Sequence, residues 1–420
     1  MLQAYRLLLL IPILTICTSV TNAPSLVRNS NPADPIAAIL ENTADALDPI
    51  DSMVNRVMRS LRLVGASVAV VKDERLVYAK GFGYADRENK VAVTKDHLFR
   101  IGSVSKLITA IAVLKLVDDG KLSLDDYVFG ERGVLKGAPY TGIKNRNVYQ
   151  IKVKHLLNHT SGWSLLTYGD PMFIPQKIHR MDKVSYPIEF DDVIKFVLTR
   201  HLPYRPGTHF NYSNFGYCLL GRVVEAKTGQ DYEAWVKNEI LAPNGITDME
   251  IAGSFEKDRL PNEVKYYDFS ADNQQLAFNG SGQMVYKPYG ADDIEMLGPA
   301  GGWLATGADL MRVLVMVDGY SKRYNDILST DLVDKMVNGV SGVNRPLGWR
   351  STNGEHWWRT GTLSGTSAIL TRDLNGYSWV VVTNTTPRRG SFTSTSRWAM
   401  REGIKMVDSW PKHDLFQQMP

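Results

Sequence analysis

Strand-like segments lie near both ends of this 420-residue chain. Residues 65–84 alternate as two strands that turn near Lys72-Asp-Glu, and further strand-like runs follow between about 345 and 384. The residues between these two regions are mainly helical in pattern. We therefore expect the strands of both regions to pair in one antiparallel sheet flanked by helices, with an inserted, mainly helical lobe. This predicts an α/β (α+β) fold.

The composition is typical of one large globular domain. Hydrophobic residues make up 44% of the chain and charged residues 22%, which is enough to bury a sizeable core. The formal net charge of +4 is small for this length, and the sequence has no basic block that would suggest nucleic-acid binding. We expect the folded domain to span residues 48–410, followed by a C-terminal tail over 411–420.

The N-terminus is typical of a secretory signal peptide. Arg6 precedes an apolar stretch over residues 7–20 that ends in the small-residue sequence Thr21-Asn-Ala23. The stretch is short for a bilayer-spanning helix, and its flanks suit cleavage. We expect a signal peptide over 1–23, a leader over 24–47, and a secreted or periplasmic mature protein with no stable membrane span.

Ser103 is the first candidate for chemistry, because Ser103-Val-Ser-Lys106 opens an apolar helical run. Residues three apart share a helix face, so the Lys106 amine would lie beside a hydroxyl that needs activation before it can attack a carbonyl. The same spacing recurs at Ser254 and Ser409. Ser254 lies in a polar stretch, and Pro411 breaks any helix after Ser409. We therefore predict Ser103 as the nucleophile.

A proton acceptor is expected in Tyr212-Ser-Asn214, which precedes the apolar helical run 215–226. A phenol has an unperturbed pKa of about 10, and a neighbouring ammonium favours its ionised form. Tyr212 is therefore a usable general base that acts together with Lys106 as a coupled pair. We expect Asn214 to hold a substrate amide or to orient Lys106, and also to serve as a helix N-cap.

The third element is a strand-like segment with a cation before Thr-Gly. The predicted substrate-binding residues on this strand are Arg359, Thr360, Gly361 and Thr362. Glycine in a strand marks a close approach to the backbone, and the amide of Thr362 would form an oxyanion hole with that of Ser103. A second Thr-Gly at Lys227-Thr-Gly229 ends a predicted helix, where glycine is the expected C-cap.

Taken in order, these three motifs resemble the serine β-lactamase and penicillin-binding-protein superfamily. The tyrosine in the middle motif points to its class C branch, which includes class C β-lactamases, D,D-carboxypeptidases, D-aminopeptidases and serine esterases. Three further segments look like this branch: 156–162, 204–214 and 298–307. The resemblance covers roughly residues 50 to 405. It implies a β-lactamase-like fold, an active site in the cleft between lobe and sheet, and an acyl-enzyme formed on Ser103.

The sequence departs from the family pattern at Arg359. The third motif begins with lysine in the lactamases and peptidases and with histidine in many esterases. A guanidinium there would bind a substrate carboxylate bidentately, or would block the site or pair with an acidic residue of the protein. We expect a serine hydrolase for ester or amide substrates, including D-Ala-terminated peptides and β-lactams. The alternative is a catalytically weak protein that binds penicillin or peptidoglycan fragments, or a scaffold.

No metal or other cofactor is expected. His155 and His159 have the spacing of zinc-protease helices, but Leu156 replaces the glutamate of such helices and no third ligand is evident. The expected partner is a small-molecule or peptide substrate, including peptidoglycan fragments, and not nucleic acid. Cys218 is the single cysteine left after signal cleavage, and we expect it to be buried as a small hydrophobe.

Overall fold

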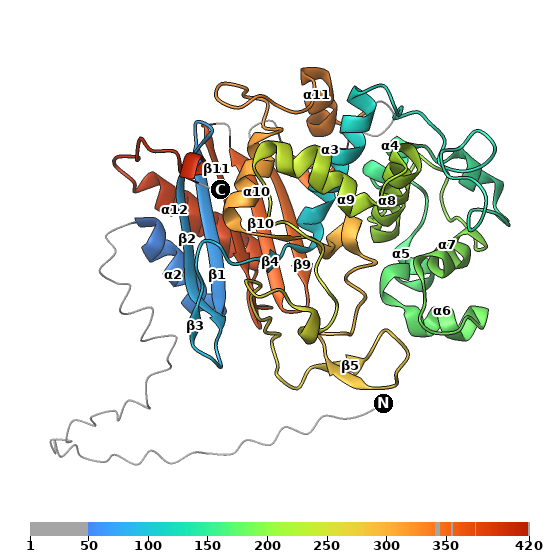
Figure 1. The fold of residues 1–420 in the computed structure, drawn as a ribbon, viewed down its shortest axis with the longest axis horizontal. Helices are drawn as coiled ribbons and strands as arrows, with labels where there is room; N and C mark the ends of the chain where they lie inside the picture. The colour runs from blue at the N-terminus through green and yellow to red at the C-terminus, as the bar shows by residue number, and fades with distance from the viewer. Residues whose placement is uncertain (1–48, 341–344, 354–355, 374, 419–420) are drawn as a thin grey trace, which may run out of the picture.

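A seven-stranded antiparallel sheet forms the centre of the computed structural model, which describes residues 49–340, 345–353, 356–373 and 375–418 (Figure 1). Its strand order is β3-β2-β1-β11-β10-β9-β8. The strands are β1 (Gly65–Lys72), β2 (Arg75–Asp86), β3 (Val91–Ala92), β8 (Ser351–Thr352), β9 (His356–Leu363), β10 (Thr366–Asp373) and β11 (Tyr377–Thr383). Val68 of β1 pairs with Val381 of β11, so the predicted pairing of N-terminal and C-terminal strands in one sheet is confirmed.

Helices cover both faces of the sheet. Helices α2 (Pro49–Leu61) and α12 (Phe392–Lys405) pack together on one face, and α10 (Gly307–Val315) lies on the other (Figure 1). Successive residues of a strand point to opposite faces, and β1 follows this rule. Val68 and its alternate neighbours join the apolar cluster with α2 and α12, whereas Ala69 belongs to the larger cluster on the other face. Because both faces are covered, β1 is apolar throughout instead of alternating with polar residues.

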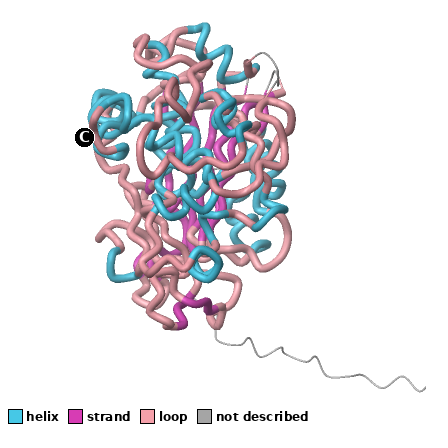
Figure 2. The backbone as a smooth tube through the Cα atoms, turned by 90° about the vertical axis from the view of Figure 1, so that its right-hand side faces the viewer, coloured by secondary structure: helices cyan, strands magenta, loops and turns pink. Residues whose placement is uncertain are grey.

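The inserted lobe lies beside the sheet, on the right in Figure 1, and faces the viewer in Figure 2. Its helices are α4 (Val153–Leu157), α5 (Leu165–Tyr168), α6 (Pro175–Asp182), α7 (Phe190–Leu198), α8 (Asn214–Thr228) and α9 (Tyr232–Val236). Helix α3 (Ser105–Asp118) packs against α8 and connects the lobe to the sheet. Almost every side chain of α3 before its last turn is buried, as expected for a helix that is apolar all round. The predicted fold class is therefore confirmed.

Short elements complete the chain. Strand β4 (Phe99–Arg100) pairs with β7 (Leu304–Ala305), and β5 (Gln274–Leu276) pairs with β6 (Met284–Tyr286). Helix α11 (Thr330–Asn338) precedes β8. Within the described residues, none of the helices is both long enough and apolar enough to cross a bilayer.

The structure bears on the predicted domain boundary at the C-terminal end of the chain only. The signal peptide and leader fall outside the described residues. Residues 411–418, which we expected to be a tail, return to the sheet: Leu76 of β2 donates its amide to Asp414 at 3.1 Å, and Phe416 is buried. The final helix, α12, ends at Lys405. Cys218 is buried in α8, as predicted.

Candidate active site

Ser103 lies in a short 3₁₀ turn (η1, Gly102–Val104) directly before α3, which begins at Ser105. The expectation that Ser103 opens the α-helix is therefore wrong by two residues. Gly102 adopts a positive φ of 51°, a backbone conformation that favours glycine and turns the chain between β4 and the helix. Because the turn ends at Val104, the Ser103 side chain stands at the helix entrance while Lys106 follows in the first helical turn.

Strand β9 runs directly beside this turn, and glycine is required on both sides of the contact. A Cβ atom on Gly361 would lie 1.9 Å from the carbonyl oxygen of Ile101, and one on Gly102 would lie 2.6 Å from the amide nitrogen of Thr362. The Cβ atom on Gly361 would also lie 2.9 Å from the amide nitrogen of Ser103. The two predicted oxyanion-hole amides, those of Ser103 and Thr362, therefore meet at this junction.

Ser103, Lys106 and Tyr212 form one hydrogen-bonded group. The Ser103 Oγ lies 2.6 Å from the Tyr212 hydroxyl, and the Lys106 Nζ donates to the Ser103 Oγ at 3.2 Å. The Lys106 side chain is completely buried. Its Nζ also donates to the Asn214 Oδ1 at 2.7 Å and to the carbonyl oxygen of Ala300 at 2.5 Å. These three acceptors match the three N–H groups of an ammonium, which compensates its burial.

Tyr212 and Asn214 are positioned by the start of α8. Ser213 caps the helix, because its Oγ accepts a hydrogen bond from the Gly216 amide at 2.9 Å. The expectation that Asn214 is the N-cap is therefore wrong, and its side chain is free to reach Lys106. The Tyr212 ring packs against the imidazole of His159 in a tilted arrangement, with 4.5 Å between the ring centroids. The His159 Nδ1 accepts from the Ser213 amide at 3.2 Å, which fixes the segment from the opposite side.

Arg359 lies behind the nucleophile instead of extending into open solvent. The side chain is 2% exposed, its Nε donates to the carbonyl oxygen of Ser103 at 2.7 Å, and its Nη2 donates to the Tyr212 hydroxyl at 3.2 Å. Both contacts use the Nε side of the guanidinium, and the buried side chain offers little surface to a substrate carboxylate. The geometry therefore favours a role of Arg359 toward Tyr212 over the expected role in substrate binding.

The electrostatics of the group prepare Tyr212 to accept a proton. Burial opposes ionisation of the phenol. The charges of Lys106 and Arg359, together with the hydrogen bonds of Lys106 and Ser103 to the phenol, outweigh burial and lower the pKa of Tyr212 to about 8. Burial also lowers the pKa of Lys106, an effect that Tyr212 opposes and the Arg359 charge reinforces. A phenol and an amine shifted toward each other can share one proton near neutral pH.

The remaining predicted residues lie on β9 or away from the group. Thr360 is half-buried, and Thr362 is exposed with its hydroxyl donating to the Gly361 carbonyl at 2.8 Å. Gly229 of the second Thr-Gly sequence has a φ of 70° and ends α8, as predicted. The His155 Nδ1 accepts from the Lys152 amide at 3.1 Å, so this histidine caps α4.

Three groups of the site were not predicted. His159 was considered only as a zinc ligand, and its place against Tyr212 depends on its left-handed backbone (φ 61°). The Ala300 carbonyl belongs to the π-helical turn Gly298–Gly302, whose sequence carries no sign of a backbone acceptor. Asp170 accepts a hydrogen bond from the Asn214 Nδ2 at 2.6 Å, although the two residues are 44 positions apart.

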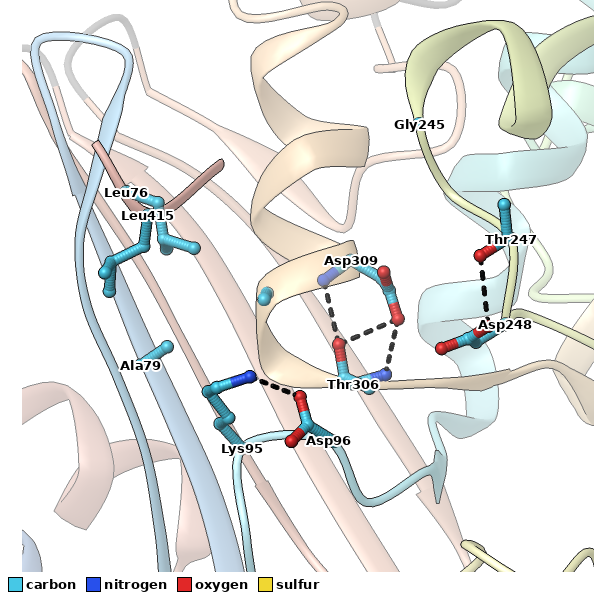
Figure 3. A pocket seen from close by; sticks show the side chains of 11 residues that line it. Leu76, Ala79, Lys95, Asp96, Gly245, Thr247, Asp248, Thr306, Asp309 and Leu415 are labelled. Carbon is cyan, nitrogen blue, oxygen red and sulfur yellow. Dashed lines mark hydrogen bonds and ion pairs between the residues drawn. The ribbon is translucent and has the colours of Figure 1, made fainter. Parts of the chain in front are cut away.

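A separate cavity of about 270 Å³ lies between β2, α10 and the C-terminal segment (Figure 3). Its polar wall includes Thr306 and Asp309, which hydrogen-bond each other at the start of α10, and Leu76 and Leu415 line it opposite (Figure 3). The carboxylate of Asp309 is thus used to cap a helix. None of the predicted catalytic residues lines this cavity.

Comparison with known proteins identifies the family. The sequence pattern of the family described as Beta-lactamase matches residues 50–400. Protein flp of Staphylococcus aureus strain COL is 27% identical over 354 residues, which cover 81% of this chain and 64% of flp. Esterase EstB of Burkholderia gladioli is 33% identical over 244 residues, which cover 55% of this chain and 59% of EstB. The chain thus spans less than two thirds of the length of these relatives.

Solved structures agree with this assignment at the level of the fold. A D-amino acid amidase from Ochrobactrum anthropi SV3 superposes with a TM-score of 0.64 at 22% identity, covering 87% of this chain and 98% of the amidase. A penicillin-binding protein homologue from Pyrococcus abyssi superposes with a TM-score of 0.62 at 25% identity, covering 85% and 78% of the two chains. With the family pattern matched over most of its length, the chain belongs to the Beta-lactamase family.

Proposed function

We propose that this protein is an exported serine hydrolase that forms an acyl-enzyme on Ser103 from ester or amide substrates. The observation that carries the proposal is the 2.6 Å contact between the Ser103 Oγ and the Tyr212 hydroxyl, with the Lys106 Nζ 3.2 Å from the same oxygen. A nucleophile within hydrogen-bond reach of a base, and a base held by further groups, is the arrangement that covalent catalysis requires. Export is proposed from the N-terminal sequence alone.

The proposed reaction has two halves. The Ser103 Oγ bonds to the substrate carbonyl carbon while its proton passes to the Tyr212–Lys106 pair, and the amides of Ser103 and Thr362 bind the resulting oxyanion. The intermediate collapses when the bond to the leaving alcohol or amine breaks and the pair returns the proton to that group. Water then attacks the acyl carbonyl, its proton passes through the same pair to the Ser103 Oγ, and the carboxylic acid is released.

The contacts of Arg359 favour a substrate that has no carboxylate beside the nucleophile. Arg359, the cation expected to bind a substrate carboxylate, already donates hydrogen bonds to Ser103 and Tyr212. A neutral ester or amide would need no ionic partner at this position.

The names of the relatives include both ester and amide hydrolysis. EstB is named an esterase, and the Ochrobactrum protein is a D-amino acid amidase. Ester and amide hydrolysis use the same acyl-enzyme chemistry and differ in the leaving group. Comparison of ester and amide hydrolysis by assay therefore identifies the leaving group.

A substrate panel tests the proposal. Hydrolysis of p-nitrophenyl butyrate, nitrocefin, a D-Ala-D-Ala peptide and a D-amino-acid amide is measured with the wild type and with Ser103→Ala. We expect turnover of the neutral ester by the wild type, no turnover by the variant, and little turnover of the carboxylate-bearing nitrocefin and D-Ala-D-Ala peptide. Efficient nitrocefin or peptide hydrolysis with poor ester hydrolysis would contradict the proposed substrate class, and equal ester rates in the two proteins would contradict the nucleophile.

A further inference from the structure

Asp170 holds the far side of the amide that contacts Lys106. It lies between α5 and a short 3₁₀ turn (η3, Pro171–Phe173), and its Oδ1 accepts from the Met172 amide at 3.1 Å. Its Oδ2 accepts from the Asn214 Nδ2 at 2.6 Å. The Asn214 Oδ1 accepts in turn from the Lys106 Nζ at 2.7 Å. A continuous series of hydrogen bonds thus joins Asp170 to the amine beside the nucleophile.

The chemistry of the two end groups fixes the orientation of the amide between them. An ammonium can only donate hydrogen bonds, and an ionised carboxylate can only accept them. The Asn214 side chain has one oxygen and one NH₂ group, so a single orientation satisfies both neighbours. In the reverse orientation the NH₂ group would face the Lys106 ammonium, donor against donor, and the amide oxygen would face the carboxylate, acceptor against acceptor. Both contacts would be repulsive.

We propose that Asp170 is a positioning residue for the acylation step, an inference that rests on the proposed function. Asp170 orients the Asn214 amide and thereby holds the Lys106 Nζ against the Ser103 Oγ. Asp170 touches neither the nucleophile nor the amine, so it acts through Asn214. The Lys106 Nζ has only one other protein acceptor besides Asn214 and Ser103, the Ala300 carbonyl, among the contacts the structure describes. Loss of the amide oxygen would leave one N–H of a fully buried ammonium without a partner.

The carboxylate cannot be replaced by an amide without loss at one of its two contacts. Both Asp170 oxygens accept, one from Met172 and one from Asn214. An asparagine at this position offers one acceptor oxygen, and its NH₂ group would face either the Met172 amide or the Asn214 NH₂ group. Asp170→Asn therefore keeps the size of the side chain but removes its charge and one of its two acceptor oxygens. Asp170→Ala removes both contacts.

The test is a double-mutant cycle read by the acylation rate. Single-turnover acylation by p-nitrophenyl butyrate is measured for the wild type, Asp170→Ala, Asn214→Ala and the double variant. We expect Asp170→Ala to slow acylation by about ten- to hundredfold, the scale for a hydrogen bond to a charged group, with KM nearly unchanged. The double variant should be no slower than Asn214→Ala, because Asp170 has no route to Lys106 once the amide is gone.

A matched control separates positioning from helix capping. Asp231 also caps a helix, accepting from the Ala234 amide at 3.0 Å, but it has no described contact with the Ser103 group. Asp231→Ala should acylate at the wild-type rate. The proposal is overturned if Asp170→Ala acylates like the wild type, or if its loss adds in full to that of Asn214→Ala. Should Asp170→Ala fail to unfold cooperatively, Asp170→Leu, which fills a similar space without an acceptor, decides instead, and a wild-type rate for it would equally overturn the proposal.

Failure of the proposed function has a different signature. If the wild type shows no acylation by any ester, the serine-hydrolase proposal fails and the cycle has no rate to report. If the wild type acylates and only the Asp170 prediction is missed, the hydrolase proposal stands without the positioning role.

Discussion

Ser103 and Ser254 are both followed by a lysine three positions later, but their surroundings differ: Ser103 is partly exposed, whereas Ser254 is buried. The Ser103 Oγ contacts the Tyr212 hydroxyl, and Lys106 is completely buried beside it. Ser254 is also completely buried, but its Oγ accepts from the Ile294 amide at 2.9 Å and contacts Glu295 at 3.4 Å. The Lys257 side chain is 82% exposed. Identical spacing therefore produces a candidate nucleophile in one place and a structural hydrogen bond in the other.

The Ser-x-x-Lys spacing therefore produces a reactive pair only where other segments supply hydrogen-bond partners for the lysine. A buried ammonium costs several kcal/mol in desolvation, which only well-placed partners offset. Lys106 has such partners in Asn214 and Ala300. Lys257 has only an exposed neighbour, Asp258 at 3.7 Å, and such surface pairs contribute about 1 kcal/mol or less. The fate of the lysine thus distinguishes the two motifs.

The largest effect is expected for the nucleophile itself. Ser103→Ala should abolish ester turnover, because the variant has no atom to form the acyl bond, whereas Ser254→Ala should retain the wild-type rate. Steady-state hydrolysis of p-nitrophenyl butyrate checks both. The contrast between the motifs would break if the two variants lost activity alike.

The next effect concerns the proton-accepting pair. Lys106→Ala and Tyr212→Phe should each slow acylation by about a hundredfold or more, the usual scale for loss of a general base. Because both groups act on one proton, the double variant should be little worse than either single variant. Lys257→Ala is the matched control and should leave the rate unchanged. Fully additive losses would show that the lysine and the tyrosine serve separate steps.

A several-fold effect is expected from Arg359. Its charge helps to lower the pKa of Tyr212 to about 8, so Arg359→Gln should raise that pKa. The base is the ionised phenol, so at neutral pH the variant should acylate more slowly, and its rate should recover as the pH is raised. The pH profile of single-turnover acylation measures this shift toward higher pH. An unmoved profile with a raised KM for carboxylate-bearing substrates would instead assign Arg359 to substrate recognition.

The smallest effect on activity is expected at Ser254, where the loss should appear in stability. Ser254→Ala leaves the buried Ile294 amide without its acceptor, which costs about 1 to 3 kcal/mol of unfolding free energy. Urea unfolding of the wild type and the variant measures this difference. A stability equal to the wild type, together with lost activity, would reverse the roles given to the two serines.

Much of the fold could be predicted because it depends on local pattern. The strands β9, β10 and β11 fall in the region 345–384 that the sequence pattern predicts to be strand-like, and turn chemistry predicts the glycine end of α8. The start of the Ser103 helix was placed two residues early, because the 3₁₀ turn depends on the contact of Gly102 with β9. The sequence offers no local sign of that contact.

The candidate site was predictable only in part, for a similar reason. Ser103, Lys106 and Tyr212 stand out because their motifs begin helices, and the structure brings them within hydrogen-bond distance. The direction of Arg359 could not be predicted, since strand alternation does not tell which face of β9 meets the Ser103 turn. Asp170 was missed because its contact with Asn214 joins a lobe loop to the start of α8 and follows no spacing rule.

The most direct test of the central claim is the position of the covalent bond. The wild type, Ser103→Ala and Ser254→Ala are treated with a fluorophosphonate, and the labelled peptides are identified by mass spectrometry. We predict one adduct on the peptide containing Ser103 in the wild type and in Ser254→Ala, and no adduct in Ser103→Ala. An adduct that persists in Ser103→Ala, or one on Ser254, would contradict the assignment of the nucleophile.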